Sequence, residues 1–184
     1  MTIAATLADR LVPRSLINNF ALVMAGASLT AVAAQIQIPM IPVPMTLQTF
    51  AVLLVGATLG AGRGALSMAT YLAMGAAGLP VFAAAKTLSG VLPTAGYLIG
   101  FVVAGALVGF AANRGLTKSP WKLALVFAGA SIVIYALGVS GLMISLGLTL
   151  PQAIVGGVLP FVFGDVIKAI AAAALLPLAW KLIR

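Results

Sequence analysis

The segment Ile38-Pro39-Met40-Ile41-Pro42-Val43-Pro44 lies near the middle of an uncharged stretch that runs from residue 15 to residue 62. As one continuous helix this stretch would extend roughly 72 Å, more than twice the hydrocarbon core of a bilayer at about 30 Å. Each proline lacks an amide donor and restricts the residue before it, so no continuous helix passes through the segment. The sequence therefore predicts two membrane-spanning helices joined by this proline-rich turn.

The composition of the whole chain also indicates a membrane protein. Of its 184 residues, 63% are hydrophobic and only 7% are charged, whereas a soluble domain carries about 25% charged residues. The apolar runs are continuous rather than alternating, which favours helices over a β-barrel. The net charge of +8 comes from scattered residues rather than a basic stripe, so nucleic-acid binding is excluded together with soluble enzymes.

Charged residues and glycine or proline turns divide the remainder of the chain into further spans of similar length. Pro160 near the start of the last span predicts a kink at its entry, because it removes a helical hydrogen bond. Glycines spaced four apart, at 56 and 60, 96 and 100, and 105 and 109, predict close helix approach in lipid. We expect one all-α membrane domain over residues 1–184, with six helices at about 16–38, 46–61, 64–80, 94–112, 123–146 and 152–180.

The distribution of basic residues predicts the orientation of these helices. With the N-terminus in the cytoplasm, Lys86 is the one basic residue in an outer turn, and Lys168 lies within the sixth helix. The other lysines and arginines then fall on the cytoplasmic side, as the positive-inside rule requires. We expect a multi-pass protein of the plasma or inner membrane with both termini cytoplasmic. An alternative takes the first span as a signal peptide cleaved near Ala31-Val32-Ala33, which leaves five helices.

Several kinds of chemistry are excluded by residues that the sequence lacks. There is no cysteine or histidine, and the only acids are Asp9 and Asp165. Thiol catalysis, a Ser-His pair and a metal-binding carboxylate cluster are therefore excluded. No Gly-Lys-Ser/Thr phosphate loop is present, so any use of ATP must come from partner subunits. We expect no catalytic residue, no metal and no cofactor, and hence no enzyme.

Asp165 and Lys168 stand three residues apart in the last predicted helix, which places both on one face. A charge at the centre of a membrane helix costs about 3 kcal/mol on insertion scales, so the two side chains should face the bundle interior and pair. As a ligand site, Asp165 would accept N–H bonds while Lys168 donates to a carbonyl, which suits a cyclic urea. The alternative is a salt bridge that merely joins helices.

Other candidate residues of a ligand site lie near the outer ends of the predicted helices. Lys86 would hold a ligand carboxylate, unless it is an ordinary solvated loop lysine. Gln48 offers a donor and an acceptor in an apolar run, although hydrogen bonding between helices would explain it equally. The aromatic residues Phe82, Tyr97 and Phe161 would wall an apolar ring, or they anchor the protein at the lipid interface.

Six stretches of the sequence together resemble the BioY family, the biotin-specific substrate-binding components of energy-coupling factor transporters. The resemblance covers nearly the whole chain, and the motifs occur in the order found in that family. They are Gln35-Ile36-Gln37-Ile38-Pro39, Pro42-Val43-Pro44-Met45-Thr46-Leu47-Gln48-Thr49, Gly60-Ala61-Gly62-Arg63-Gly64, Gly75-Ala76-Ala77-Gly78-Leu79-Pro80-Val81-Phe82, Pro93-Thr94-Ala95-Gly96-Tyr97-Leu98-Ile99-Gly100-Phe101 and Pro160-Phe161-Val162-Phe163-Gly164-Asp165-Val166-Ile167-Lys168.

The resemblance implies a six-helix protein that captures biotin from outside with high affinity. It places Asp165 and Lys168 on the ureido ring, in agreement with the chemistry argued from the residues alone. Gln48 is implied as a third contact, and Lys86 is assigned to the biotin carboxylate by its charge and its position in the loop.

The resemblance also implies partners, namely a membrane coupling subunit and two cytoplasmic ATPases. Such components dock through an Ala-x-x-x-Ala surface in the first helix. The chain offers two such pairs, Ala21 with Ala25 and Ala27 with Ala31, and we expect the second pair to be the docking surface. A homo-oligomer is a further possibility.

Three other functions fit parts of the sequence. A binding component for another vitamin would share the fold and the partners but differ in the pocket. A structural membrane protein would use Asp165 and Lys168 only to hold helices together. A proton-coupled secondary transporter would need a titrating acid within the membrane, and Asp165 is the only candidate.

Overall fold

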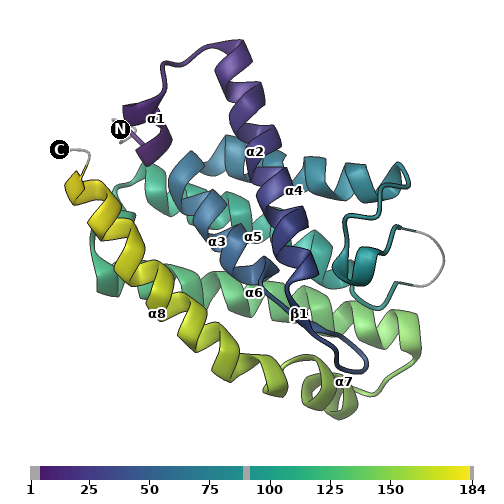
Figure 1. The fold of residues 1–184 in the computed structure, drawn as a ribbon. Coiled ribbons are helices and arrows are strands. Elements are labelled where there is room, and N and C mark those ends of the chain that lie inside the picture. The colour runs from purple at the N-terminus through teal and green to yellow at the C-terminus, as the bar shows by residue number, and fades with distance from the viewer. Residues whose placement is uncertain (1–4, 89–91, 183–184) are drawn as a thin grey trace.

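Helices make up nearly all the regular structure in a computed structural model of the chain, which describes residues 5–88 and 92–182 (Figure 1). Helices α2, α5, α6 and α8 are each long and apolar enough to cross a membrane. The all-α membrane bundle predicted from the sequence is therefore confirmed. In chain order the elements are α1 (Leu7–Leu11), α2 (Leu16–Gln35), β1 (Gln37–Ile38), β2 (Met45–Thr46), α3 (Gln48–Leu59), α4 (Ala61–Ala76), η1 (Ala83–Ala85), α5 (Ala95–Asn113), η2 (Leu116–Lys118), α6 (Pro120–Leu146), α7 (Leu150–Gly157) and α8 (Leu159–Leu182).

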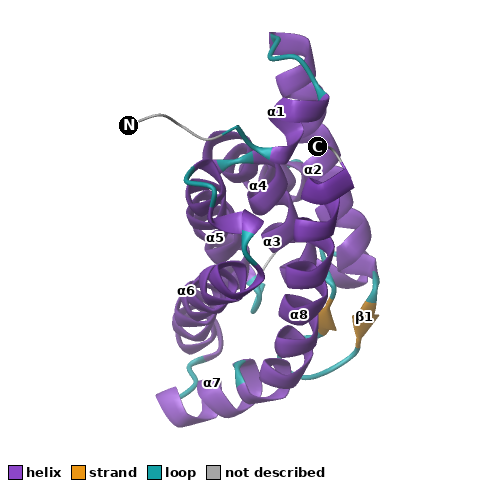
Figure 2. Ribbon diagram, turned by 90° about the vertical axis from the view of Figure 1, so that its left-hand side faces the viewer, coloured by secondary structure: helices purple, strands orange, loops and turns teal. Residues whose placement is uncertain are grey.

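Helix α1 and the C-terminal end of α8 lie at the same end of the bundle, and the β1–β2 hairpin and α7 lie at the opposite end (Figures 1 and 2). Segment η2 is at the end with α1, because Lys118 contacts Trp180 near the end of α8. Basic residues of the N-terminal segment, η2 and the end of α8 therefore share one end, as the positive-inside argument requires. We call this the cytoplasmic end and the other the outer end.

The proline-rich turn after the first membrane helix is a short β-hairpin rather than an irregular loop. Helix α2 ends at Gln35, earlier than the predicted residue 38, and the chain continues into antiparallel strands β1 and β2. Gln37 pairs with Thr46 and Ile38 with Met45. The prolines occupy the connection between the strands, where no ladder hydrogen bond needs their missing N–H groups.

Helices α3 and α4 are both shorter than the predicted spans of 46–61 and 64–80. They contain 12 and 16 residues, so they are roughly 18 and 24 Å long, against about 30 Å of hydrocarbon. Gln48 at the start of α3 is buried, so this helix begins inside the bundle. Its first turn therefore faces the interior of the outer half, where polar groups from several helices meet.

The last predicted span, 152–180 with a kink at its entry, is divided in the structure into α7 and α8. The break lies at Val158, whose φ of −127° and ψ of −59° are not helical. Pro160 explains the break, since a continuing helix would need a residue-160 N–H to bond the carbonyl of Gly156. Pro160 now lies in the first turn of α8, where a residue has no helical acceptor for its N–H group, so the missing N–H breaks no hydrogen bond of that helix.

Helix α5 is the central helix of the bundle and packs against α3, α4 and α6. Its glycines allow backbones to touch. A Cβ atom on Gly105 would lie 3.1 Å from the carbonyl oxygen of Gly64 in α4, and one on Gly96 would lie 2.2 Å from the carbonyl oxygen of Leu137 in α6. The close approach predicted from glycines spaced four apart is therefore confirmed for α5.

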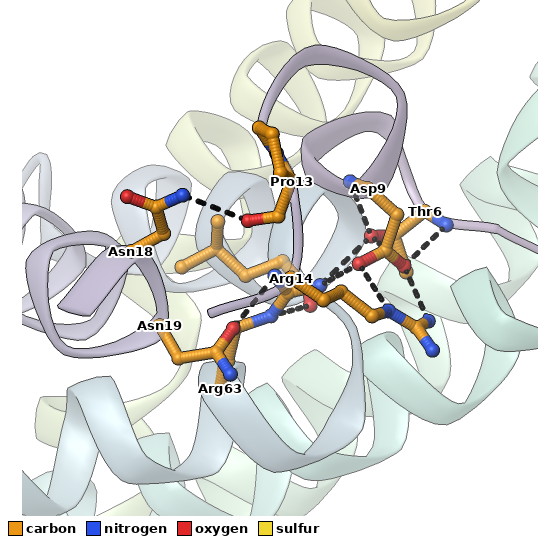
Figure 3. A network of polar contacts seen from close by, with 8 residues as sticks. Thr6, Asp9, Pro13, Arg14, Asn18, Asn19 and Arg63 are labelled. Carbon is orange, nitrogen blue, oxygen red and sulfur yellow. Dashed lines mark hydrogen bonds and ion pairs between the residues drawn. The ribbon is translucent and has the colours of Figure 1, made fainter. Parts of the chain in front are cut away.

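A polar network ties the N-terminal segment to the cytoplasmic turn between α3 and α4 (Figure 3). Thr6 caps α1 and both donates to and accepts from Asp9. The Asp9 carboxylate also accepts from Arg14 at 2.9 and 3.0 Å and from Arg63 of α4 at 2.6 Å. Arg63 further donates to Asn19 of α2 and to the carbonyl of Leu59. This Asp9 clamp therefore joins α1, α2 and the α3–α4 turn.

Replacing Asp9 by Asn should loosen the N-terminal segment. The Arg14 guanidinium holds the pKa of Asp9 well below its ordinary value of 3.8, with further help from Thr6 and Arg63. The clamp should therefore be complete at any pH above about 4 and be lost as the pH falls through that lowered pKa. We expect Asp9→Asn to lower stability by about 2 kcal/mol at pH 7, with faster hydrogen exchange in residues 7–11.

Arg10→Gln is the matched control for this variant, because Arg10 is exposed on the same short helix. Its exchange profile and melting temperature should equal those of the wild type at pH 7. Equal exchange rates in Asp9→Asn and Arg10→Gln would contradict the clamp.

Substitution of Gly109 in α5 tests the packing against the α3–α4 turn. A Cβ atom on Gly109 would lie 2.3 Å from backbone atoms of Gly60 and Ala61, so Gly109→Ala must push the helices apart and should cost about 2 kcal/mol. Gly129→Ala in α6 is the control, since no atom lies within 4 Å of its new Cβ. Thermal denaturation in detergent should show a lower melting temperature for Gly109→Ala alone.

Candidate functional site

The buried charges Asp165 and Lys168 lie on one face of α8, as their spacing predicts. The Nζ atom of Lys168 is 2.9 Å from Oδ1 of Asp165, and the two side chains are only 12% and 10% exposed. Such a pair is stable in a low-dielectric interior only when its remaining hydrogen-bonding groups also find partners.

Three other elements supply those partners. Tyr135 of α6 donates its hydroxyl to Oδ2 of Asp165 at 2.5 Å, and Thr49 of α3 donates to Oδ1 at 3.0 Å. Lys168 donates to Oγ1 of Thr49 at 3.0 Å and to the backbone carbonyl of Thr46 at 2.8 Å. With Asp165 as the third acceptor, all three ammonium hydrogens of Lys168 are used. The carboxylate accepts three bonds and retains unused lone-pair directions.

A cavity that is partly open to solvent lies beside this charge pair. Hydrophobic side chains form one part of its wall, and hydroxyl, amide and charged groups form another. The lining residues are Val43, Pro44, Thr46, Gln48, Thr49, Ala83, Thr94, Tyr97, Leu98, Phe101, Ile134, Tyr135, Phe161, Asp165 and Lys168. Such an arrangement can bind a small molecule that has a polar head and an apolar body.

Gln48 and Tyr97, both proposed from the sequence, do line this cavity, and their polar groups have structural partners. The Nε2 atom of Gln48 donates to the hydroxyl of Tyr71 at 2.8 Å, and its Oε1 accepts from Thr46 at 2.9 Å. The Tyr97 hydroxyl donates to the carbonyl of Gly157 at 2.7 Å. Gln48 thus connects α3 to α4, and Tyr97 connects α5 to α7, while both present surface to the cavity.

Phe82 and Lys86 line a second pocket next to the first rather than the cavity itself. The two pockets share Pro44, Ala83 and Thr94 as a common wall. Lys86 is exposed, while Phe82 is buried and packs edge-on against Tyr71 with ring centroids 5.3 Å apart. Lys86 therefore lines the second pocket and not the cavity that contains the Asp165–Lys168 pair. Phe161, in contrast, lines the first cavity as proposed.

Of the two alanines proposed as a docking surface, Ala27 does not lie on the exposed face of α2. Ala27 is 0% exposed, packed inside the bundle. Ala21 and Ala25, the other pair at the same spacing, are exposed. The physical reason is that residues six positions apart on a helix point in directions about 240° apart, so the two pairs cannot share one face.

Two residues that bond to the Asp165–Lys168 pair, Thr49 and Tyr135, were not predicted from the sequence. Thr49 lies one residue after Gln48 in a stretch already singled out, and three residues after Thr46. Tyr135 is a phenol in the middle of an apolar span, far from the interface positions that tyrosines usually occupy in membrane proteins. A tyrosine at such a position indicates a hydrogen bond inside the bundle, and this was the signal from which Tyr135 could have been predicted.

The charge pair has a testable energetic consequence. Lys168→Met should leave the Asp165 carboxylate buried with two hydroxyl donors and no counter-charge, at a cost of about 3 kcal/mol or more. The double variant Asp165→Leu with Lys168→Met should regain most of that loss, because neither charge remains. Thermal denaturation in detergent of the two variants beside the wild type measures the difference. Equal melting temperatures for the single and double variants would contradict the coupling.

The fold and the cavity together define a class: a membrane helix bundle with a small-ligand site near its outer end. The model of the BioY family matches residues 4–184 of the chain, and the chain belongs to the BioY family. A biotin transporter BioY of Thermotoga maritima is 44% identical over 156 residues, which cover 83% of this chain and 90% of the relative. A probable biotin transporter BioY of Pyrococcus horikoshii is 38% identical over 157 residues, covering 84% and 91%.

A solved structure gives the same result for the fold. The crystal structure of the S-component for biotin from an ECF-type ABC transporter superposes with a TM-score of 0.78 at 25% sequence identity. The match covers 90% of this chain and 92% of that one. The resemblance predicted from sequence motifs is therefore confirmed.

Proposed function

We propose that the chain is a biotin transporter subunit, the biotin-binding S component of an energy-coupling factor importer. The observation that carries this proposal is the Asp165–Lys168 pair beside an apolar cavity at the outer end. Membership of the BioY family and the relatives named biotin transporters support biotin as the ligand. No step of bond-making chemistry is required, so the protein acts by binding and transport rather than as an enzyme.

Biotin has the polar head and apolar body that the cavity suits. Its ureido N–H groups would bond the unused lone pairs of Asp165, and its ureido oxygen would accept from Lys168 in place of one present acceptor. The thioether ring and chain would lie against Phe101, Ile134 and Phe161. The valerate carboxylate would extend toward the second pocket, where Lys86 supplies a positive charge.

The partners of this importer are also part of the proposal. We infer a membrane coupling subunit that docks on the exposed Ala21 and Ala25 face of α2, where small side chains permit close helix contact. Two cytoplasmic ATPases would supply the energy, since the sequence lacks a phosphate loop of its own. The protein needs no cofactor in this scheme, and it would reside in the plasma membrane.

Asp165→Asn tests the ligand assignment. The amide removes the charge and presents an N–H donor where a ligand N–H should be accepted, so biotin affinity should fall about 10- to 100-fold. Titration calorimetry of the purified protein in detergent, with biotin as the titrant, measures this directly.

Asp9→Asn removes the chain's other acidic side chain at the cytoplasmic end and should leave biotin affinity unchanged. Thiamine and riboflavin should not compete with biotin in the same assay. Unchanged biotin affinity in Asp165→Asn would contradict the assignment, and tight binding of another vitamin instead would point to a related S component.

A further inference from the structure

A group of lysines and tryptophans lies at the cytoplasmic end, apart from both the ligand cavity and the Asp9 clamp. It consists of Lys118 in η2, Trp121 and Lys122 in the first turn of α6, and Trp180 and Lys181 near the end of α8. The Nζ atom of Lys118 lies 4.9 Å from the ring centroid of Trp180, and that of Lys122 lies 5.7 Å from the ring centroid of Trp121. We call these five residues the basic–aromatic patch.

No acidic side chain in the described part of the chain neutralises the charges of this patch. The chain has only two acidic side chains: Asp9 is bound by Arg14 and Arg63, and Asp165 by Lys168. Within residues 5–88 and 92–182, Lys118, Lys122 and Lys181 form no salt bridge, and all three are exposed. Three cations therefore lie at the cytoplasmic end, on η2, α6 and α8, with no acidic partner among the described residues.

The backbone at the start of α6 carries a partial positive charge, the same sign as the charge of the lysines. Helix α6 starts with Pro120 after Ser119, whose side chain makes no capping bond. The amide groups of this first turn carry the partial positive charge of the helix N-terminus, and Lys122 stands among them. The anion that suits the patch is therefore one with several acceptor oxygens, such as a phosphate group.

Apolar surface adjoins the lysines and identifies the source of that phosphate. Trp121 is 63% exposed, and Leu125, one turn further into α6, is exposed as well. On α8, Leu178 and Leu182 flank Trp180 and are also exposed. A free phosphate ion would leave these groups without a partner, whereas a phospholipid brings a phosphate headgroup together with acyl chains.

We propose that the basic–aromatic patch binds the headgroup of an anionic phospholipid in the cytoplasmic leaflet. The tryptophan rings lie at the level of the headgroups and hold the lysine ammonium groups beside them by cation–π contact. The lipid phosphate lies among Lys118, Lys122 and Lys181, and the acyl chains lie along the exposed leucines of α6 and α8. The patch thus fixes the ends of these two helices at a defined depth.

The test is retention of added phospholipid by the purified full-length protein in neutral detergent, measured by native mass spectrometry. Phosphatidylglycerol should be retained about tenfold better than phosphatidylcholine by the wild type. Lys118→Gln and Lys122→Gln should each reduce phosphatidylglycerol retention about fivefold. Arg10→Gln removes one exposed charge at the same end but outside the patch, and its retention should equal that of the wild type.

Three results would overturn the proposal. Equal loss in Arg10→Gln would show that the lipid responds only to net charge. Displacement of phosphatidylglycerol by 50 mM inorganic phosphate, at about the same ionic strength as a chloride control, would show a site for the phosphate ion alone. Unchanged lipid retention in both lysine variants, with weaker assembly with the coupling module, would assign the patch to an acidic protein partner. Melting temperatures of all variants should match the wild type, so lost retention does not reflect unfolding.

Discussion

The ion pair between Asp165 and Lys168 is the constraint on which the outer half of the bundle depends. Two charges in a membrane interior are tolerated only when they pair with each other and find further hydrogen-bonding partners. That demand explains why α3 starts inside the bundle, where Thr49 reaches Asp165, and why α6 places a tyrosine hydroxyl at mid-helix. It also explains why β2 turns a backbone carbonyl toward Lys168. A rigid polar centre results from four elements of the chain.

Close helix packing holds those elements in place. The backbones of α4, α5 and α6 touch at glycines, because a side chain at Gly96 or Gly105 would collide with a carbonyl oxygen of the facing helix. Such contacts depend on shape and not on a hydrophobic driving force, which is absent between helices in lipid. The same rigidity keeps Tyr97 against α7 and Tyr135 against α8. The packed helix backbones therefore give the cavity its shape before any ligand binds.

Much of the fold and part of the candidate site could be predicted from the sequence, because few structures accommodate a charge or a proline within an apolar membrane chain. The number of spans, the proline turn and the pairing of Asp165 with Lys168 all follow from that rule. Thr49 and Tyr135 could not be found in this way, since hydroxyls in membrane helices often bond their own backbone, as Thr58 and Ser140 do. The buried face of α2 was equally hidden, because that helix is apolar on nearly every side and shows no polar stripe. Only tertiary contacts show which hydroxyl groups bond to another helix and which face of α2 is buried.

The carbonyl of Thr46 gives the β1–β2 hairpin a part in recognition that its small size does not suggest. This carbonyl holds one of three ammonium hydrogens on Lys168, and the other two are also engaged. Because this carbonyl is the acceptor that β2 offers to Lys168, the backbone of the hairpin is part of the wall of the site and does not merely connect two helices. A ligand oxygen that accepted the same hydrogen would replace this bond between β2 and α8, so ligand affinity depends on the position of a strand that lies outside the helices.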